Sequence, residues 1–206
     1  DLHLCDRRQR QMCIRDSLLP GAIAILCSLS HRKEESAGKY YSVFSMPLNL
    51  SKFEMAKGMI LIEKLLVARV FLALLISISN IISPATAVYS VPQSIAGSIA
   101  IVIASVWQIP LCLYLARKTG LFVPIMLNTV LGIFLPILLG NTAVWWLMPY
   151  CWAAKLAEPL MGIELNGTFA GNPGFSCTIF IPVALSIFLF IALSFVDAKD
   201  FAKGGR

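Results

Sequence analysis

Three long stretches of the chain contain no Asp, Glu, Lys, Arg or His. They run over Val70–Ala116 (47 residues), Thr119–Ala154 (36 residues) and Leu165–Val196 (32 residues). A soluble domain of this length needs charged residues on the wet face of every element, whereas about 20 apolar residues cross a bilayer as a helix. Since helices satisfy their own backbone hydrogen bonds inside lipid, the pattern predicts several helical membrane spans.

The expected spans follow the apolar runs, and polar segments separate them. They are placed near residues 18–30, 65–82, 94–116, 121–146 and 178–196. The composition agrees, with 58% hydrophobic and 14% charged residues. Pro110, Pro124, Pro136 and Pro182 fall within spans, where each removes a backbone donor and can kink its helix. We therefore expect an all-α, multi-pass helical bundle in a membrane.

The first residues do not fit this pattern. Residues 1–17 show neither helical nor strand periodicity, and RRQRQMCIRDS within them resembles a translated sequencing adapter. The alternative is a basic amphipathic lead-in at a membrane surface. We expect residues 1–17 to be non-native and residues 18–206 to form one transmembrane domain. The run at 18–30 would then be the second half of a span whose first half is missing.

Lysine and arginine distribute unequally between the polar segments. Ten of them fall in the segments 31–57, 117–118 and 197–206, whereas the connection 147–177 has only Lys155 and the turn 83–92 has none. Because cytoplasmic loops carry the excess of basic residues, the first three segments are predicted to be cytoplasmic and the other two to face outward. The net charge of +6 belongs to this asymmetry. It does not indicate nucleic-acid binding, which requires a basic patch with groove-reading or aromatic elements.

The sequence contains no complete enzyme motif. Glu34-Glu35 followed by Lys39 is similar to the paired-glutamate motif of CAAX-type intramembrane proteases, but the chain has only His3 and His31 as histidines. It also lacks HExxH, the phosphate loop GxxxxGK[ST] and any metal-ligand spacing. We therefore expect no catalytic activity, no metal and no bound cofactor in this chain.

Three charged residues lie near the start of the span at 65–82, namely Glu63, Lys64 and Arg69. Arg69 can extend to the interface or pair with Glu63, or it can face a substrate. No other Asp, Glu, Lys, Arg or His falls inside a predicted span. Because carriers driven by protons or ions need such groups near the midplane, any transport is expected to draw energy from elsewhere.

The outward connection begins with an aromatic group and contains two cysteines. Trp145, Trp146, Tyr150 and Trp152 are expected to form an aromatic belt at the outer interface. Cys151 and Cys177 can form a disulfide or remain free, and spacing does not decide between these alternatives.

The segment 31–57 carries the most specific pattern. Glu35-Ser-Ala-Gly38 is followed by an aromatic run at 40–44, the break Ser45-Met-Pro47, and a short amphipathic helix ending in Ala56-Lys57. This order resembles the first cytoplasmic loop of ABC-2 type permeases, in which a coupling helix docks into the ATPase subunit. The resemblance assigns coupling roles to Pro47, Phe53, Glu54 and Lys57. An ordinary interfacial helix with basic anchors is the alternative.

A second stretch resembles the outward loop of the lantibiotic-protection permeases. The pattern begins with Pro149 and Trp152, continues with an apolar helix and Pro159-Leu-Met-Gly162-Ile, and ends with Asn166-Gly. Glu164-Leu165 departs from the Leu-Pro often found before that Asn-Gly pair. The resemblance therefore favours the LanE-type subunit but does not exclude the LanG type. Trp152, Glu158 and Asn166 are the expected substrate-proximal residues, and the acid suits a cationic peptide.

Together the two resemblances imply a bacterial ABC-2 permease with six spans in the intact protein, the first of which is missing here. They imply as partners a separate ATPase subunit that binds ATP, a second and different permease, the lipid bilayer and a lantibiotic peptide exported for self-protection. Two alternatives stay open. One is an ABC-2 exporter of a drug, lipid or polysaccharide, and the other is a membrane scaffold or sensor that transports nothing.

Overall fold

The computed structural model describes residues 18–38, 40–45, 49–82, 91–161 and 179–204, and within these ranges the chain is helical with no strand. The adapter-like segment 1–17 lies outside the described residues. The helices are α2 (Leu19–Ser36), α3 (Tyr41–Ser45), α4 (Leu50–Ile82), α5 (Val91–Ser105), α6 (Gln108–Thr119), α7 (Phe122–Leu139), the 3-10 turn η2 (Trp145–Leu147), α8 (Pro149–Met161) and α9 (Phe180–Gly204).

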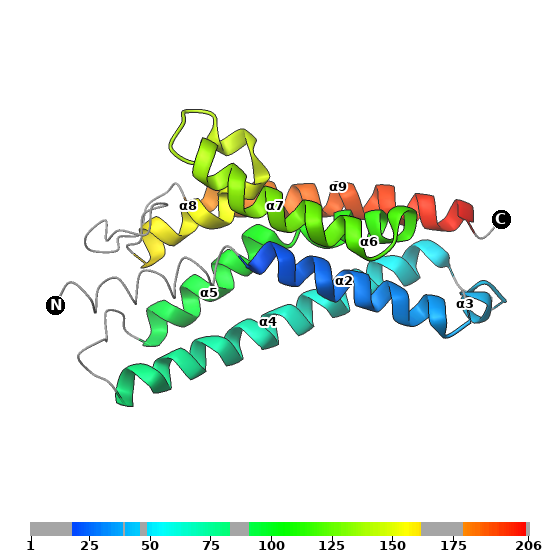
Figure 1. Cartoon of the computed structure of the whole chain (residues 1–206), viewed down its shortest axis with the longest axis horizontal. Coiled ribbons are helices and arrows are strands. Elements are labelled where there is room, and N and C mark those ends of the chain that lie inside the picture. The colour runs from blue at the N-terminus through cyan, green and yellow to red at the C-terminus, as the bar shows by residue number, and fades with distance from the viewer. Residues whose placement is uncertain (1–17, 39, 46–48, 83–90, 162–178, 205–206) are drawn as a thin grey trace.

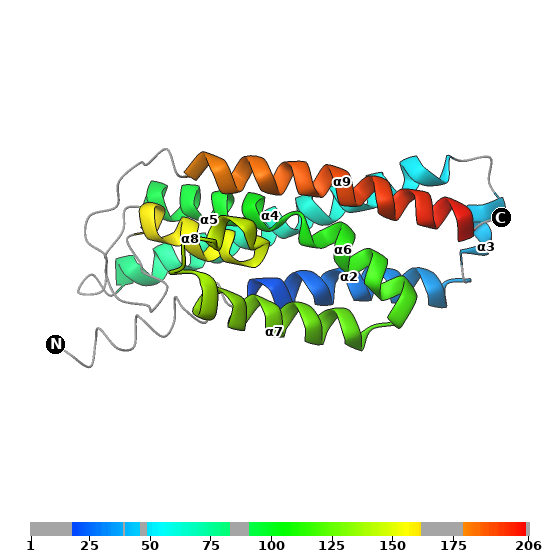
Figure 2. The ribbon, with the colours of Figure 1, turned by 90° about the horizontal axis from the view of Figure 1, so that it is seen from above.

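The helices form one elongated bundle (Figure 1). α3, the start of α4 and the C-terminal end of α9 lie together at one end, whereas α8 and the last turns of α4 lie toward the other (Figure 2). α2 packs against α6 and α7, and α4 packs against α5 and α9. The segments predicted to be cytoplasmic therefore gather at the same end of the bundle.

Polarity is inverted relative to a water-soluble bundle. Large apolar side chains are exposed along α4, α7 and α9, among them Phe71, Phe134 and Phe188. Polar side chains such as Gln108 and Asn128 are fully buried. Such an exterior is unfavourable in water and suits lipid.

By length and hydropathy, α7 and α9 can each cross a membrane, and α5 with α6 forms a third candidate if the bent pair is one span. The chain is therefore a helical protein with two or three candidate spans among its described residues. The expected span at 65–82 lies within α4, and the count of five spans stays a prediction.

The expected span at 94–116 is broken in the middle. α5 and α6 meet at 46°, because Pro110 has no N–H to donate to the carbonyl of Val106. That carbonyl instead accepts from the N–H of Ile109 at 3.0 Å. One turn earlier, the hydroxyl of Ser186 in α9 donates to the carbonyl of Ile103 at 2.8 Å. A local turn and one side chain of α9 thus satisfy these two carbonyls at the break.

The outward connection differs from expectation at its start. The predicted span at 121–146 ends already at Leu139, and the chain then folds back as α8, which packs against α5. Tyr150 and Trp152 are buried in this contact, whereas Trp146 is exposed. The aromatic-belt interpretation is therefore wrong for Tyr150 and Trp152, since turning α8 back toward the bundle makes them core residues.

The amphipathic segment expected to end at Lys57 does not end there. α4 continues without a break from Leu50 to Ile82, about 50 Å at 1.5 Å per residue. Arg69 is only 6% exposed, so the interpretation that it extends to the membrane surface is wrong: its face of α4 points into the bundle.

α2 and α7 approach each other at two glycines. A Cβ at Gly132 would lie 2.5 Å from Cγ of Pro20, and one at Gly21 would lie 2.7 Å from the hydroxyl oxygen of Thr129. Small residues at such contacts let helix backbones pack closely inside a membrane.

Replacing Gly132 with alanine is expected to lower the free energy of unfolding by about 1–3 kcal/mol, because the rigid Pro20 ring has to move. The measurement is thermal unfolding of the purified protein in detergent. Gly58→Ala is the matched control, since a Cβ there meets Phe190 at an ordinary 3.9 Å. It should be neutral or stabilising, because alanine favours the helix. Equal effects of the two variants would contradict the close approach of α2 and α7.

Candidate functional site

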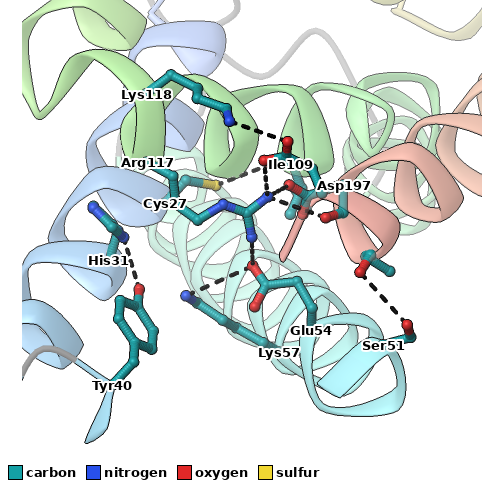
Figure 3. A network of polar contacts seen from close by, with 12 residues as sticks. Cys27, His31, Tyr40, Ser51, Glu54, Lys57, Ile109, Arg117, Lys118 and Asp197 are labelled. Carbon is teal, nitrogen blue, oxygen red and sulfur yellow. Dashed lines mark hydrogen bonds and ion pairs between the residues drawn. The ribbon is translucent and has the colours of Figure 1, made fainter. Parts of the chain in front are cut away.

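Charged side chains of α4, α6 and α9 meet at the end of the bundle near α3 (Figure 3), and one from α2 joins them. We call them the charged cluster: Glu34 from α2, Glu54 and Lys57 from α4, Arg117 and Lys118 from α6, and Asp197 and Asp200 from α9. Each lies in the first or last turns of its helix, next to an apolar run. The charges therefore fall at one level when the helices pack side by side.

Arg117 is at the centre of the charged cluster. Its guanidinium pairs with the carboxylate of Asp197 and donates to the Asp197 carbonyl at 3.1 Å. Its Nη1 lies 3.2 Å from Oε1 of Glu54, and its Cζ lies 5.1 Å from the centre of the Phe201 ring. One side chain thereby joins the ends of α4, α6 and α9.

Two further ion pairs surround this centre. Nζ of Lys57 lies 2.7 Å from Oε2 of Glu34, which links α4 to α2. Nζ of Lys118 lies 3.0 Å from Oδ1 of Asp200, but Lys118 is half exposed and this pair is worth little in water.

Glu54 is the least satisfied member of the charged cluster. It is buried, and neither carboxylate oxygen accepts a well-aligned hydrogen bond from the described residues. Its attraction to Arg117 is therefore coulombic. Burial raises the pKa of Glu54, while the nearby charges of Lys57 and Arg117 oppose that rise. A small movement of α4 relative to α6 would change how well this carboxylate is paired.

An aromatic group lies beside the charged cluster. Tyr40 adopts φ +63°, a left-handed conformation that is uncommon outside glycine. Its ring packs edge-on against Phe201 at 5.5 Å and lies 5.7 Å from Nζ of Lys57. Its hydroxyl is 2.7 Å from Nδ1 of His31. These contacts hold the connection between α2 and α4 against the cluster.

Burial affects two titratable groups in this aromatic contact. It lowers the pKa of His31, and the charge of Lys57 acts in the same direction. It raises the pKa of the Tyr40 hydroxyl. Both groups are therefore neutral at physiological pH, which suits a Tyr–His hydrogen bond between uncharged partners.

A second polar group lies deeper in the bundle. Nδ2 of Asn128 in α7 donates to the carbonyl of Pro20 at 2.6 Å and to Oε1 of Gln108 at 3.2 Å. The hydroxyl of Tyr150 in α8 donates to Oδ1 of Asn128 at 2.8 Å. This asparagine network connects α2, α6, α7 and α8 close to the break between α5 and α6.

The structure brings together some of the residues predicted for coupling. Glu54 and Lys57 belong to the charged cluster, and Phe53 stacks on Phe201 with ring centres 6.1 Å apart. All three contact other helices of the chain, so in this conformation they are joined to the bundle rather than presented at its surface. Pro47 lies outside the described residues.

The residues predicted for the outward side are less fully described. Trp152 is buried and its indole N–H donates to the Trp146 carbonyl at 2.8 Å. Glu158 lies in α8, but its side chain is outside the described part, as is Asn166. Cys151 is a buried free thiol, and Cys177 falls outside the described residues.

Sequence reasoning missed the roles of Arg117 and Asp197. It used Arg117 only as a topological marker, although a basic residue directly after one apolar run and an acid directly after another were available as signals. Among the described residues, no three His, Cys, Asp or Glu side chains are grouped to hold a metal ion. No protein-family model, curated protein or solved structure matches the chain.

Proposed function

We propose that the chain is the permease subunit of an ABC transporter of the ABC-2 type, which exports lantibiotic peptides from a bacterial membrane. ATP would be bound by a separate subunit, and the permease would act together with a second permease subunit. The proposed family rests on the two sequence resemblances, one in the segment 31–57 and one in the segment 149–167. The charged cluster is the observation that supports a mechanical role.

The charged cluster joins four helices at the end predicted to be cytoplasmic. An ATPase that moved the start of α4 would act on Glu54 and Lys57, and through Arg117 and Asp197 on α6 and α9. A purely structural cluster would satisfy each of its buried carboxylates, whereas Glu54 lacks an aligned donor among the described residues. An unsatisfied buried carboxylate suits a joint whose pairing changes between two conformations.

α4 is suited to carry such a movement across the bundle. It is a single helix of 33 residues and contacts α5 as well as α9. α5 in turn packs against α8, the helix that contains Glu158. Movement at the charged cluster would then reach the side proposed to meet the peptide. Trp152 would support the position of α8 from within.

The experiment is coexpression with the neighbouring ATPase and permease genes in a sensitive Gram-positive host. The assembly should raise the lantibiotic concentration that the host survives. Glu54→Gln, which keeps the side-chain shape, should retain the ATPase in a detergent pull-down but lower protection about tenfold. Lys52→Gln, at an exposed position two residues earlier in α4, is the matched control.

Three results would revise the proposal. Protection by Glu54→Gln equal to the native protein would exclude a coupling role for the charged cluster. Protection against unrelated drugs but no lantibiotic would favour a general ABC-2 exporter. Failure to recover any ATPase with the chain would favour a membrane scaffold or sensor.

A further inference from the structure

The connection between α2 and α4 depends on a few side-chain contacts of Tyr40. Its left-handed backbone (φ +63°) is unfavourable for a residue that has a Cβ, so its side chain has to hold it in place. The ring centre lies 5.5 Å from that of Phe201 in α9 and 6.2 Å from that of Phe44 in α3. The hydroxyl lies 2.7 Å from Nδ1 of His31 (Figure 3). Of these partners, His31 is the one that changes its charge near neutral pH.

His31 is a buried imidazole with charged groups of both signs around it. It is only 9% exposed. The cations that face it are Lys57 of α4 and Arg117 of α6, and the acids are Glu34 and Glu35 of α2. Glu34 is held by Lys57 at 2.7 Å, whereas Glu35 lies 3.9 Å from Nε2 of His31 with its side chain 58% exposed. One acid is thus already engaged and the other faces water, so neither balances a positive charge on the buried ring.

The stability of this contact depends on pH. Burial lowers the pKa of His31 from its ordinary value of 6.5, and the nearby charge of Lys57 acts in the same direction. A histidine released into water keeps the ordinary pKa, so protonation favours the released state. The contact is therefore fully stabilised above pH 6.5 and loses stability as the pH falls through 6.5 toward the lower pKa of the buried ring. A protonated imidazole also carries N–H groups on both nitrogens and cannot accept a hydrogen bond from Tyr40.

We propose that His31 and Tyr40 form an acid-sensitive latch at the end of the bundle predicted to be cytoplasmic. At neutral pH the latch holds Tyr40 and α3 against α9. When His31 takes up a proton from water, the latch opens and Tyr40 leaves its left-handed conformation. Lys57 then loses the aromatic ring that lies 5.7 Å from its Nζ.

The consequence of the latch for transport rests on the proposed function. Lys57 belongs to the charged cluster, and Phe53 stacks on the same Phe201 ring that Tyr40 contacts. Opening the latch therefore weakens the packing at the start of α4, which is the part on which the ATPase is proposed to act. We expect weaker coupling in an acidified cell. The opening itself does not depend on the ATPase.

The opening is measured as the distance between two spin labels on the full chain in lipid nanodiscs, in a background without native cysteines. The labels are attached to Tyr41→Cys in α3, where the native residue is 74% exposed, and to Lys199→Cys in α9, which is also an exposed position. The distance distribution should be narrow at pH 7.5. At pH 5.5 a broad component should grow about threefold or more, with a midpoint below the ordinary histidine pKa.

His31→Gln keeps a polar side chain that cannot take up a proton, so its distance distribution should stay narrow at both pH values. Opening in acid despite this change would assign the effect to another group, such as Glu54, and overturn the proposal. Glu35→Gln gives a second measurement at low ionic strength. It removes a carboxylate that favours protonation of His31, so the midpoint should move to lower pH. If His31→Gln is open at both pH values, the Glu35→Gln midpoint decides, and an unchanged midpoint overturns the latch.

Recovery of the ATPase with the same chain is measured separately at pH 7.5 and pH 5.5. If the latch opens in acid but no ATPase is recovered at either pH, the proposed function is refuted and the latch is not. If the ATPase is bound and the label distance does not change with pH, this inference is refuted alone. With both intact, the native chain should protect an acidified host less well than His31→Gln does.

Discussion

Replacing Arg117 with alanine is expected to lower the free energy of unfolding by about 3–5 kcal/mol, because it leaves a buried ion pair without one partner. Asp197 and Glu54 are both buried and both depend on this guanidinium. Lys57, 3.9 Å from Glu54, would be the cation remaining near the two acids. The loss also removes the contact of Arg117 with the Phe201 ring.

Chemical unfolding of the protein in mixed micelles measures this loss. Lys118→Ala is the control next in sequence, since Lys118 is 51% exposed, and it should cost less than about 1 kcal/mol. Arg117→Lys should recover only part of the stability, because a single ammonium group cannot reach Glu54 and Asp197 with the two-armed geometry of arginine. Equal stability of Arg117→Ala and Lys118→Ala would show that the charged cluster does not hold the helix ends together.

The apolar runs of the sequence predicted the helical class correctly because they report directly on which segments avoid water. α7 lies inside a run without charge, α9 does so as far as Val196, and length and hydropathy identify both as candidate spans. The break between α5 and α6 was predictable as a kink from Pro110. Its position at residues 106–107 depends also on Ser186 of another helix, which no local pattern contains.

The positions of the charges were harder to predict. Sequence reasoning placed the start of a span at Leu65 because Glu63 and Lys64 precede it. The structure extends α4 without a break from Leu50, and contacts at Ser51 and Gly58 pack it against α9. The bounds of this helix depend on contacts between helices, which no local charge pattern contains.

Part of the candidate site was accessible from the sequence and part was not. Glu54 and Lys57 were selected because their segment resembles a coupling loop, and both belong to the charged cluster. Their partner Arg117 is 63 residues away from Glu54, and no spacing rule connects positions on different helices. Trp152 was expected near a peptide because it matches the outward-loop pattern, but the packing of α8 against α5 buries it.

Replacing Asn128 with leucine is expected to lower the free energy of unfolding by about 2–4 kcal/mol, because it leaves buried polar groups without partners. Tyr150 would lose the acceptor of its hydroxyl, and Gln108 would lose a donor at its side-chain oxygen. Leucine has the same branched arrangement of side-chain heavy atoms as asparagine and a larger volume, so the loss would come chiefly from hydrogen bonds rather than from an empty cavity. Because the asparagine network joins four helices, the transition should also become less cooperative.

Tyr150→Phe separates the hydrogen bond from the packing of the ring. It keeps the edge-on contact with Trp107 at 4.9 Å and should cost about 1 kcal/mol. The combined variant Asn128→Leu with Tyr150→Phe should be no less stable than Asn128→Leu alone, since it removes the hydroxyl that the first change leaves unpaired. If the two losses simply add, the hydroxyl of Tyr150 finds another acceptor, and Asn128 does not connect α8 to the rest of the bundle.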